Sequence, residues 1–415
     1  RGKTWDLVVD GIDDGAFVRS VREDPEVPGL VYVATETGVW FSRDAGGSWD
    51  SLQFELPRVP VTDLAVKGDD LVISTQGRSF WILDDLTVIR QSQEALDADE
   101  IALMAPEPAF RERWDSTRVH FYLPEGLEKA PVVRSMHAGG ERDGELIRAY
   151  AVETDDLKAK SKKGMGTIKA EPGMNLFRWN FRGEGPAKVP GAVAWPGHPP
   201  GPRVVPGTYT VALSAGDVTR SAPFEILSDP RSETDGTGYA EQFALLMEIH
   251  ESLDSAHEAV NQIRTVRGQI KTAMDRAKTA GLDDDLKEDA KSLREVLTEI
   301  EEAIIQTKSK SSQDPLNFPV RLNDKIGALA YTVDGDHPPT AQSRRVFEHL
   351  DSQLSEHLDR LAEVMEESIP AFNAKVLDLR VPAIVLEDDE ADESEDDAEE
   401  DEGDAEAGPW GGESL

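Results

Sequence analysis

The stretch SRDAGGSWDS, residues 42–51, places a serine, an aspartate, a glycine and a tryptophan at a spacing that favours a tight turn. An aspartate carboxylate such as that of Asp44 can accept hydrogen bonds from backbone N–H groups just ahead of it, and glycine can adopt positive φ. Trp49 then offers a large ring for packing. The preceding segments 30–35 and 38–42 are rich in strand-forming residues, so the stretch is predicted to be a turn between strands.

The same pattern recurs along the first part of the chain. The opening residues RGKTWD repeat the end of the stretch, with matched pairs Gly2 and Gly46, Thr4 and Ser48, and Trp5 and Trp49. A second echo lies downstream, with Val33-Ala34-Thr35 matching Ile73-Ser74-Thr75, Trp40 matching Trp81, and Asp44 matching Asp85. A period of about 40–45 residues with several short strands per unit is typical of a β-propeller blade.

Four residues, Ser42, Asp44, Gly46 and Trp49, match the pattern S-x-D-x-G-x-x-W. The chain thereby resembles Asp-box (BNR) repeat proteins, which include sialidases, sortilin-type receptors and photosystem II assembly factors. Residues 75–86, TQGRSFWILDDL, resemble the final blade of the large bacterial proteins called glycosyl hydrolases or sortilin-like proteins. The resemblance implies that Gly2 and Trp5 end another Asp-box, that earlier blades precede residue 1, and that the Asp-box residues are structural.

Composition along the chain, together with what the family resemblance implies, predicts a multidomain α+β protein. The predicted parts are the last two blades of a partial β-propeller (1–91), a linker (92–116), a β-sandwich (117–230), a helical domain (231–380) and a disordered acidic tail (387–415).

Short strands separated by turn signals indicate the β-sandwich. Residues 173–182, GMNLFRWNFR, and 206–217, PGTYTVALSAGD, resemble the Ig-like modules that follow such propellers. Between them a loop rich in proline and glycine carries Trp195 and His198. We expect this loop to lie on the sandwich, and a contact with the propeller is the alternative.

Helical periodicity begins after residue 231. Apolar residues recur every seven positions in two series: Leu246, Leu253 and Val260, and Ile249, Ala256, Ile263 and Ile270. Gly281 is predicted to end this helix, and acidic residues 283–285 to begin the next. Four helices with short connections indicate an antiparallel bundle or helical hairpins, whose role could be self-association or packing against the propeller.

The acidic end and the overall charge exclude some partners. Residues 387–406 hold 15 acidic residues and no basic one, so this tail is predicted to be disordered, including Trp410 farther along. The net charge of −37 argues against nucleic-acid binding, and no apolar run is long enough to span a membrane. Cysteine is absent, which leaves the compartment open. The family resemblance implies a secreted or periplasmic protein.

Residues that could carry glycosidase chemistry are spread over the first 91 positions. The resemblance to sialidases directs attention to arginines that hold a carboxylate and to a tyrosine nucleophile, and the candidates are Arg19, Tyr32, Arg58 and Arg78. Paired carboxylates would come from Glu36, Asp63, Asp84 and Asp85, but we expect Asp84 and Asp85 to fix a turn, as Asp44 does. No spacing marks these residues as one set. Arg78, beside a predicted turn, is the candidate chosen for a pocket, and a strand-end arginine that holds a neighbouring blade is the alternative.

A metal site is the remaining chemical hypothesis. His250, Asp254 and His257 share a helix face and are residue types that zinc accepts, but the sequence lacks the H-E-x-x-H pattern. Histidines beside an apolar seam need no metal, so we expect neither a metal nor a cofactor.

Two functions remain. The first is a non-catalytic scaffold that binds protein or carbohydrate. The second is a glycosyl hydrolase, sialidase-like, whose active site would lie mainly in upstream blades, which would leave this chain inactive. Fold resemblance alone does not decide between them.

Overall fold

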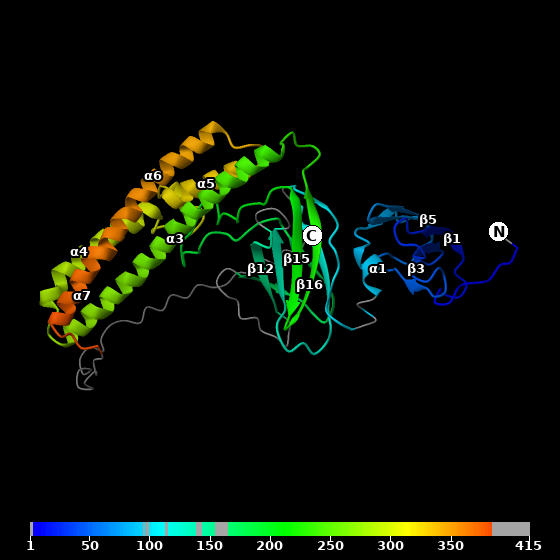
Figure 1. The fold of residues 1–415 in the computed structure, drawn as a ribbon, viewed down its shortest axis with the longest axis horizontal. Coiled ribbons are helices and arrows are strands. Elements are labelled where there is room, and N and C mark those ends of the chain that lie inside the picture. The colour runs from blue at the N-terminus through cyan, green and yellow to red at the C-terminus, as the bar shows by residue number, and fades with distance from the viewer. Residues whose placement is uncertain are drawn as a thin grey trace, which may run out of the picture. The chain divides into compact units, whose positions relative to one another are not determined.

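The computed structural model describes residues 3–93, 96, 99–112, 115–137, 143–153 and 165–383. Strands dominate up to Leu227, and long helices begin at Gly236 (Figure 1). The mixture of β-strands and helices agrees with the α+β class predicted from the sequence. Gly2, the acidic tail and Trp410 lie outside the described residues. None of the helices in the described ranges could cross a membrane.

The chain forms two compact units. The first contains Arg1–Gln262 and Ile300–Arg360, and the second contains Ile263–Glu299 and Leu361–Leu415.

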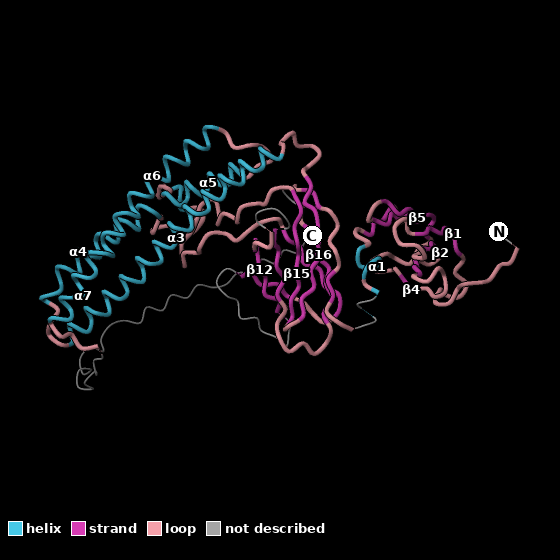
Figure 2. The backbone as a smooth tube through the Cα atoms, in the orientation of Figure 1, coloured by secondary structure: helices cyan, strands magenta, loops and turns pink. Residues whose placement is uncertain are grey.

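The first unit begins with two antiparallel meanders, whose strands are drawn in magenta around the labels β1, β2, β4 and β5 in Figure 2. The first sheet has the order β1-β2-β3-β4 and the second has the order β5-β6-β7. The strands are β1 (Val18–Glu23), β2 (Val31–Thr35), β3 (Val39–Ser42), β4 (Asp50–Ser51), β5 (Val61–Lys67), β6 (Asp70–Thr75) and β7 (Phe80–Leu83). The short helix α1 (Thr87–Gln91) follows.

The two meanders share one pairing register. In the first, Val18 pairs with Thr35 and, after an irregularity, Ser20 pairs with Ala34. In the second sheet Val61 pairs with Thr75, and the same irregularity precedes the pair Asp63 and Ser74. The pairs Val33–Trp40 and Ile73–Trp81 are likewise equivalent. The repeat identified in the sequence, in which Val33 matches Ile73 and Trp40 matches Trp81, is therefore also present in the strand pairing.

One apolar core joins these sheets. Alternating side chains of β2 and β3 face those of β5 and β6, as the period of two in a strand requires, and α1 closes one side with Ile89. The buried members are Leu30, Tyr32, Ala34, Val39, Phe41, Leu52, Leu56, Val61, Leu64, Leu71, Ile73, Leu86 and Ile89.

Two further sheets form the next part of the first unit. One has the order β14-β10-β8 and the other β13-β12-β11-β15-β16-β9. Their strands are β8 (Ala102–Leu103), β9 (Ala109–Phe110), β10 (Thr117–Leu123), β11 (Val132–His137), β12 (Leu146–Glu153), β13 (Met165–Lys169), β14 (Gly173–Trp179), β15 (Gly207–Ala215) and β16 (Val218–Leu227).

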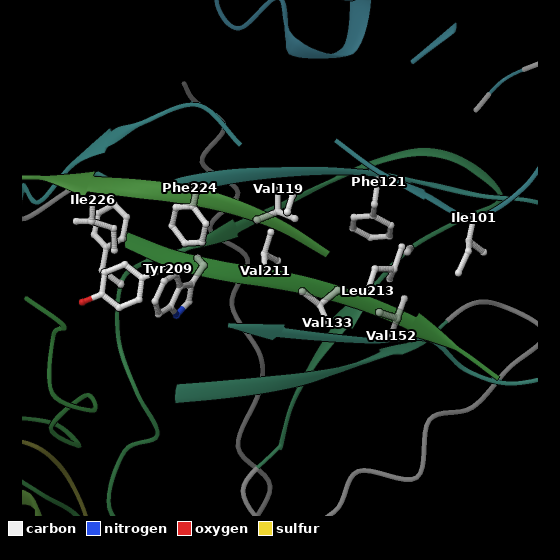
Figure 3. Packing of buried hydrophobic residues seen from close by; sticks show 14 of the residues in the cluster. Ile101, Val119, Phe121, Val133, Val152, Tyr209, Val211, Leu213, Phe224 and Ile226 are labelled. Carbon is white, nitrogen blue, oxygen red and sulfur yellow. The ribbon is translucent and has the colours of Figure 1, made fainter. Parts of the chain in front are cut away.

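Both of these sheets contribute to a second core, part of which is drawn in Figure 3. Trp179 is 1% exposed, and its ring makes edge-on contacts with Phe181, Tyr209 and Phe224 at centroid distances of 6.0–6.2 Å. Such aromatic contacts add to the free energy gained by burial. Residues 173–182 and 206–217, singled out in the sequence, thus supply the centre of this core.

The segment expected to be a linker is partly built into these sheets. β8 pairs antiparallel with β10, and β9 pairs parallel with β16. Beside β8, Ile101 and Met104 are 7% and 2% exposed. Burying Ile101 and Met104 is favourable, so this part of the predicted linker pairs with the sheets instead of crossing as a free connector.

The helices follow the predicted order. They are α3 (Gly236–Thr279), α4 (Asp284–Ile304), the 3₁₀ turn η2 (Asp314–Leu316), α5 (Leu322–Val333), α6 (Ala341–Glu363), the π-helical turn η3 (Val364–Ser368) and α7 (Ile369–Asp378). Gly281 has φ +68° and lies between α3 and α4, as a helix-ending glycine does.

The predicted heptad residues of α3 are buried inside the chain. Leu253, Val260 and Ile263 are each at most 1% exposed. The seam therefore packs internally, and self-association through the helices stays a prediction.

Candidate functional site

The turn at residues 42–51 is held by side-chain hydrogen bonds. Ser42 Oγ donates to Asp44 Oδ1 (2.7 Å), and the Ser48 N–H donates to the same oxygen (2.9 Å). The Gly46 N–H donates to Ser42 Oγ (2.8 Å). The hydrogen bond from Ser42, followed by that from Ser48, lowers the pKa of Asp44 to about 2. These groups satisfy one another, which gives the turn a structural role.

The two matched tryptophans differ in their surroundings. Trp49 is 8% exposed, and its indole N–H donates to the Val8 carbonyl (3.1 Å). The Trp49 backbone N–H donates to the Asp10 carbonyl (2.8 Å). Trp5, by contrast, is 87% exposed. Through Val8 and Asp10, the segment before β1 is thus hydrogen-bonded to the turn at residues 42–51. The Trp5 side chain, in contrast, is largely exposed to solvent.

Three catalytic candidates form ion pairs with residues of β1 or lie on it: Asp63 of β5, Glu36 just after β2, and Arg19 of β1 itself. Arg22 forms an ion pair with Asp63 (2.6 Å), and Ser20 Oγ donates to the same carboxylate (2.7 Å). Arg19 forms an ion pair with Glu36 (2.5 Å). We call Arg19, Ser20, Arg22, Glu36 and Asp63 the β1/β5 polar row. Each arginine in this row is already neutralised by a carboxylate of the same row.

Arg58 also has an acidic partner. It forms an ion pair of 2.6 Å with Asp13, and its side chain is 70% exposed. At the protein surface such a pair contributes little to stability, but Asp13 already occupies the guanidinium that a ligand carboxylate would bind.

Tyr32 is the only tyrosine among residues 1–91, and it faces the core. It is 0% exposed, and its hydroxyl donates to Asp24 Oδ2 (3.0 Å). Burial, together with the charge of Asp24, raises the pKa of Tyr32 well above its usual range. A nucleophilic phenolate needs the opposite shift and access to a substrate.

Arg90 also binds the Asp24 carboxylate. Its Nε donates to Asp24 Oδ2 (3.1 Å), and its Nη1 forms an ion pair with Asp69 (2.7 Å). The side chains of Arg90 and Asp24 are 4% and 0% exposed. Burial alone would raise the pKa of Asp24, but the hydrogen bonds from the Glu26 N–H and from Arg90 outweigh it and lower the pKa. Sequence reasoning missed this network because its members are up to 66 residues apart.

Arg78 is the exception among the candidate arginines. It is exposed in the hairpin between β6 and β7, next to Gly77 and Ser79, both of which have positive φ. Its backbone carbonyl accepts a hydrogen bond from the Trp81 indole (3.0 Å). Within the described ranges its guanidinium has no ion-pair partner. Arg78 is therefore the one candidate arginine whose charge remains open to a ligand, as far as the described residues go.

The two aspartates after β7 have separate environments. Asp84 is exposed. Asp85 accepts a hydrogen bond from the Thr87 N–H (3.0 Å) and lies 2.7 Å from His120 Nε2. Burial opposes ionisation, but the hydrogen bonds from His120 and Thr87 lower the pKa of Asp85 to about 2. Asp85 thus fixes the start of α1 and joins β7 to β10.

The helix face that suggested a metal site binds backbone groups. Asp254 Oδ1 accepts the Ala187 N–H (2.7 Å), and His257 Nδ1 donates to the Ala187 carbonyl (2.6 Å). Burial lowers the pKa of both His250 and His257, so both favour the neutral form. No metal-binding group of three ligands occurs in the described part of the chain.

The loop containing Trp195 and His198 lies along the helices. The Trp195 N–H donates to Asp324 Oδ1 (3.1 Å), and the Tyr331 hydroxyl donates to the His198 carbonyl (3.1 Å). The expectation of a loop covering the sandwich missed this packing, because helix side chains recognise backbone atoms that a sequence pattern does not reveal.

A buried cationic cluster holds the strands and helices of the first unit together. Arg111 is 0% exposed, and it donates to Gln242 Oε1 and to the Val204 carbonyl, both at 2.7 Å. Arg182 pairs with Asp334, which also lies 3.6 Å from Arg203. Burial and then the charge of Arg203 lower the pKa of Arg111 to about 10. The sequence showed no local signal for this cluster.

The comparisons with known proteins give little further guidance. A scan against models of protein families finds no match, and a search of curated proteins finds none. Among solved structures, the chain has some similarity to the extracellular domain of a protein assigned as a hybrid two-component system from B. thetaiotaomicron. The identity is 11%, the TM-score is 0.16, and the alignment covers 51% of this chain and 25% of that one. The match therefore spans a quarter of that protein, and it is too weak to indicate a fold or a function.

Proposed function

We propose that this chain is part of an exported Asp-box β-propeller protein and acts as a non-catalytic scaffold that binds protein or carbohydrate. In this proposal the two meanders are successive blades, the strands from β8 to β16 are an Ig-like module, and the helices are an accessory domain. The repeated strand register supports the blades, since equivalent pairs recur at an offset of about 40–43 residues.

Exposed apolar side chains on the meanders are consistent with this proposal. Phe80 and Ile82 of β7 are 74% and 59% exposed, and Val21 of β1 is 52% exposed. Neighbouring apolar side chains exposed in this way are typical of a surface that another element covers. Further blades packed against the outer faces of the two sheets would cover them.

For the residues of this chain, the environment of Tyr32 favours binding over hydrolysis. It is the only tyrosine of the meanders, and it is buried against Asp24 rather than exposed beside Arg19, Arg58 or Arg78. The carboxylates of the β1/β5 polar row are occupied by arginines. A glycosidase that uses two carboxyl groups needs both of them free to flank the glycosidic bond.

The experiment is an assay of the chain with aryl glycosides, including an aryl sialoside. We expect no release of the aryl group above the rate without protein. Hydrolysis that disappears in an Arg78→Ala variant and persists in an Arg118→Ala control would support the glycosyl hydrolase instead of the scaffold. Binding is tested with the same variants on immobilised glycans and peptides. Loss of binding in Arg78→Ala alone would support the scaffold.

A further inference from the structure

A groove of ≈ 800 Å³ runs along one face of α3 and α4 in the second unit. Met274 and Ala290 line its apolar part. Five basic and four acidic side chains line it, whereas the whole chain has 44 basic and 81 acidic residues. The basic members are Lys271, Lys278, Lys287, Lys291 and Arg294. The groove is therefore lined by more basic than acidic side chains, whereas acidic side chains outnumber basic ones in the chain as a whole.

The positive charges of this groove are mostly unpaired. Lys291 has only a 4.0 Å contact with Glu295. Across the described residues, Lys271, Lys278, Lys287 and Arg294 have no ion-pair partner. In a helix, residues three, four and seven positions apart share one face. Lys287, Lys291 and Arg294 therefore form one row on α4, opposite Lys271 and Lys278 on α3.

From this groove and the tail sequence, we propose that the acidic segment 387–406 of the same chain docks onto the groove between α3 and α4. This segment has 15 carboxylates and no basic residue, which makes it complementary in charge to the row of unpaired cations.

The tail can reach the groove. Lys375 Nζ donates to Asp289 Oδ2 (2.7 Å), which places α7 beside α4. Asp289 lies about 200° around α4 from Lys287 at 100° per residue, so the tail must pass round one helix about 10–12 Å in diameter. Residues 379–386 span up to about 26–29 Å when extended, at about 3.3–3.6 Å per residue. The first acidic residues therefore arrive at the groove with chain to spare.

The attraction comes from many weak contacts rather than one strong one. Exposed ion pairs each contribute little, and salt screens them over a distance of about 8–10 Å at physiological ionic strength. Tethering raises the local concentration of carboxylates at the groove to the millimolar range, about what a short flexible linker gives. Docking should therefore be reversible and should weaken with added salt.

The experiment measures distances between two spin labels in the full-length chain. The absence of native cysteine allows labelling at Ser394→Cys in the tail and Thr272→Cys on α3 without other changes. The test variant combines Lys271→Gln, Lys278→Gln and Lys287→Gln. The matched control combines Lys67→Gln, Lys129→Gln and Lys169→Gln, which removes the same number of charges from the strand region.

We expect a population of short distances in the parent and in the control. It should fall at least about two-fold in the groove variant, and also when salt rises from about 0.05 M to about 0.5 M. Distances that are equally broad in all three proteins and at both salt concentrations would overturn the proposal. So would short distances that survive the groove variant, because the tail would then dock elsewhere. Dilution with unlabelled protein must leave the short distances unchanged, and their loss would assign the groove to the tail of a second copy instead.

Discussion

Ser20 in β1 donates a hydrogen bond of 2.7 Å to Asp63 in β5, and the two residues hold the same register position in their sheets. Each is the first paired residue after the strand irregularity. Equivalent positions of the repeat therefore meet directly, and the Ser20 hydroxyl links the two meanders through the same Asp63 carboxylate that pairs with Arg22.

Replacing Ser20 by alanine should loosen this link. A hydrogen bond to a side chain typically contributes about 1 kcal/mol to folding stability. We expect amide hydrogen exchange in β1 and β5 to become about five-fold faster, measured by mass spectrometry. Thr62→Ala, which removes an exposed hydroxyl bonded to Ser74 in the same sheet, is the control. Equal changes in both variants would contradict a specific role for the Ser20–Asp63 contact.

The turn at residues 42–51 should respond to acid. The pKa of Asp44 is about 2 in the folded chain and 3.8 in its ordinary state. Because the folded pKa is depressed, the carboxylate stabilises the fold above pH ~4, and this contribution is lost as the pH falls towards ~2. Carbon NMR of the side-chain carboxyl would give the pKa directly.

The Asp44→Asn variant should lower the unfolding midpoint at neutral pH and flatten its dependence on pH between these limits. Asp50→Asn removes a charge from the adjoining strand and serves as the control. A parent and an Asp44→Asn variant with parallel pH profiles would refute the role assigned to the carboxylate.

Removing Arg90 should destabilise the first sheets strongly. The Arg90→Ala change leaves the buried Asp24 carboxylate without its cation, and breaking a buried pair on one side costs about 3–5 kcal/mol. Chemical denaturation followed by exchange of β2 and β6 amides would measure the loss. Arg58→Ala, at a surface ion pair, should change stability by less than about 1 kcal/mol. Similar losses in the two variants would show that burial of the Asp24 pair has no energetic consequence.

The contact between α3 and the loop before Trp195 should weaken in acid. Burial lowers the pKa of His250 and His257 below the ordinary 6.5. The unfolded chain therefore binds more protons, so the stability contributed by the neutral rings is complete above pH ~6.5 and declines as the pH falls below it.

We expect the Ala187 amide, which donates to Asp254, to lose protection between pH ~7.5 and pH ~5.5 after correction for intrinsic exchange rates. A His250→Gln/His257→Gln variant should lose most of this dependence, because glutamine can still donate to the Ala187 carbonyl but does not titrate. Unchanged pH dependence in the double variant would place the sensitivity elsewhere.

Local signals in the sequence account for much of the fold. Asp44 and its glycines specify a turn within ten residues, Gly281 ends a helix by its own conformation, and the heptads around Leu253 identify a buried face. In each case the residues that carry the information are neighbours along the chain or repeat at a fixed period.

Contacts made across long separations could not be predicted in this way. Arg90 meets Asp24 across 66 residues, and His257 meets the carbonyl of Ala187 across 70. An arginine that neutralises a buried carboxylate and one that awaits a ligand look alike in a sequence. Only the fold distinguishes Arg19, which pairs with Glu36, from Arg78, whose partner is not found among the described residues.

Among the described residues the second meander ends on an open side, since β7 is the outermost strand of its sheet there. In the first meander β4 occupies the corresponding place beside β3. The outward backbone groups of β7, with Phe80 and Ile82 next to them, form a template onto which another polypeptide can add as a strand. Concentrated solutions of this chain should therefore tend to aggregate through β-strand pairing, and an Ile82→Lys substitution, which places a charge on the exposed edge strand, should discourage it.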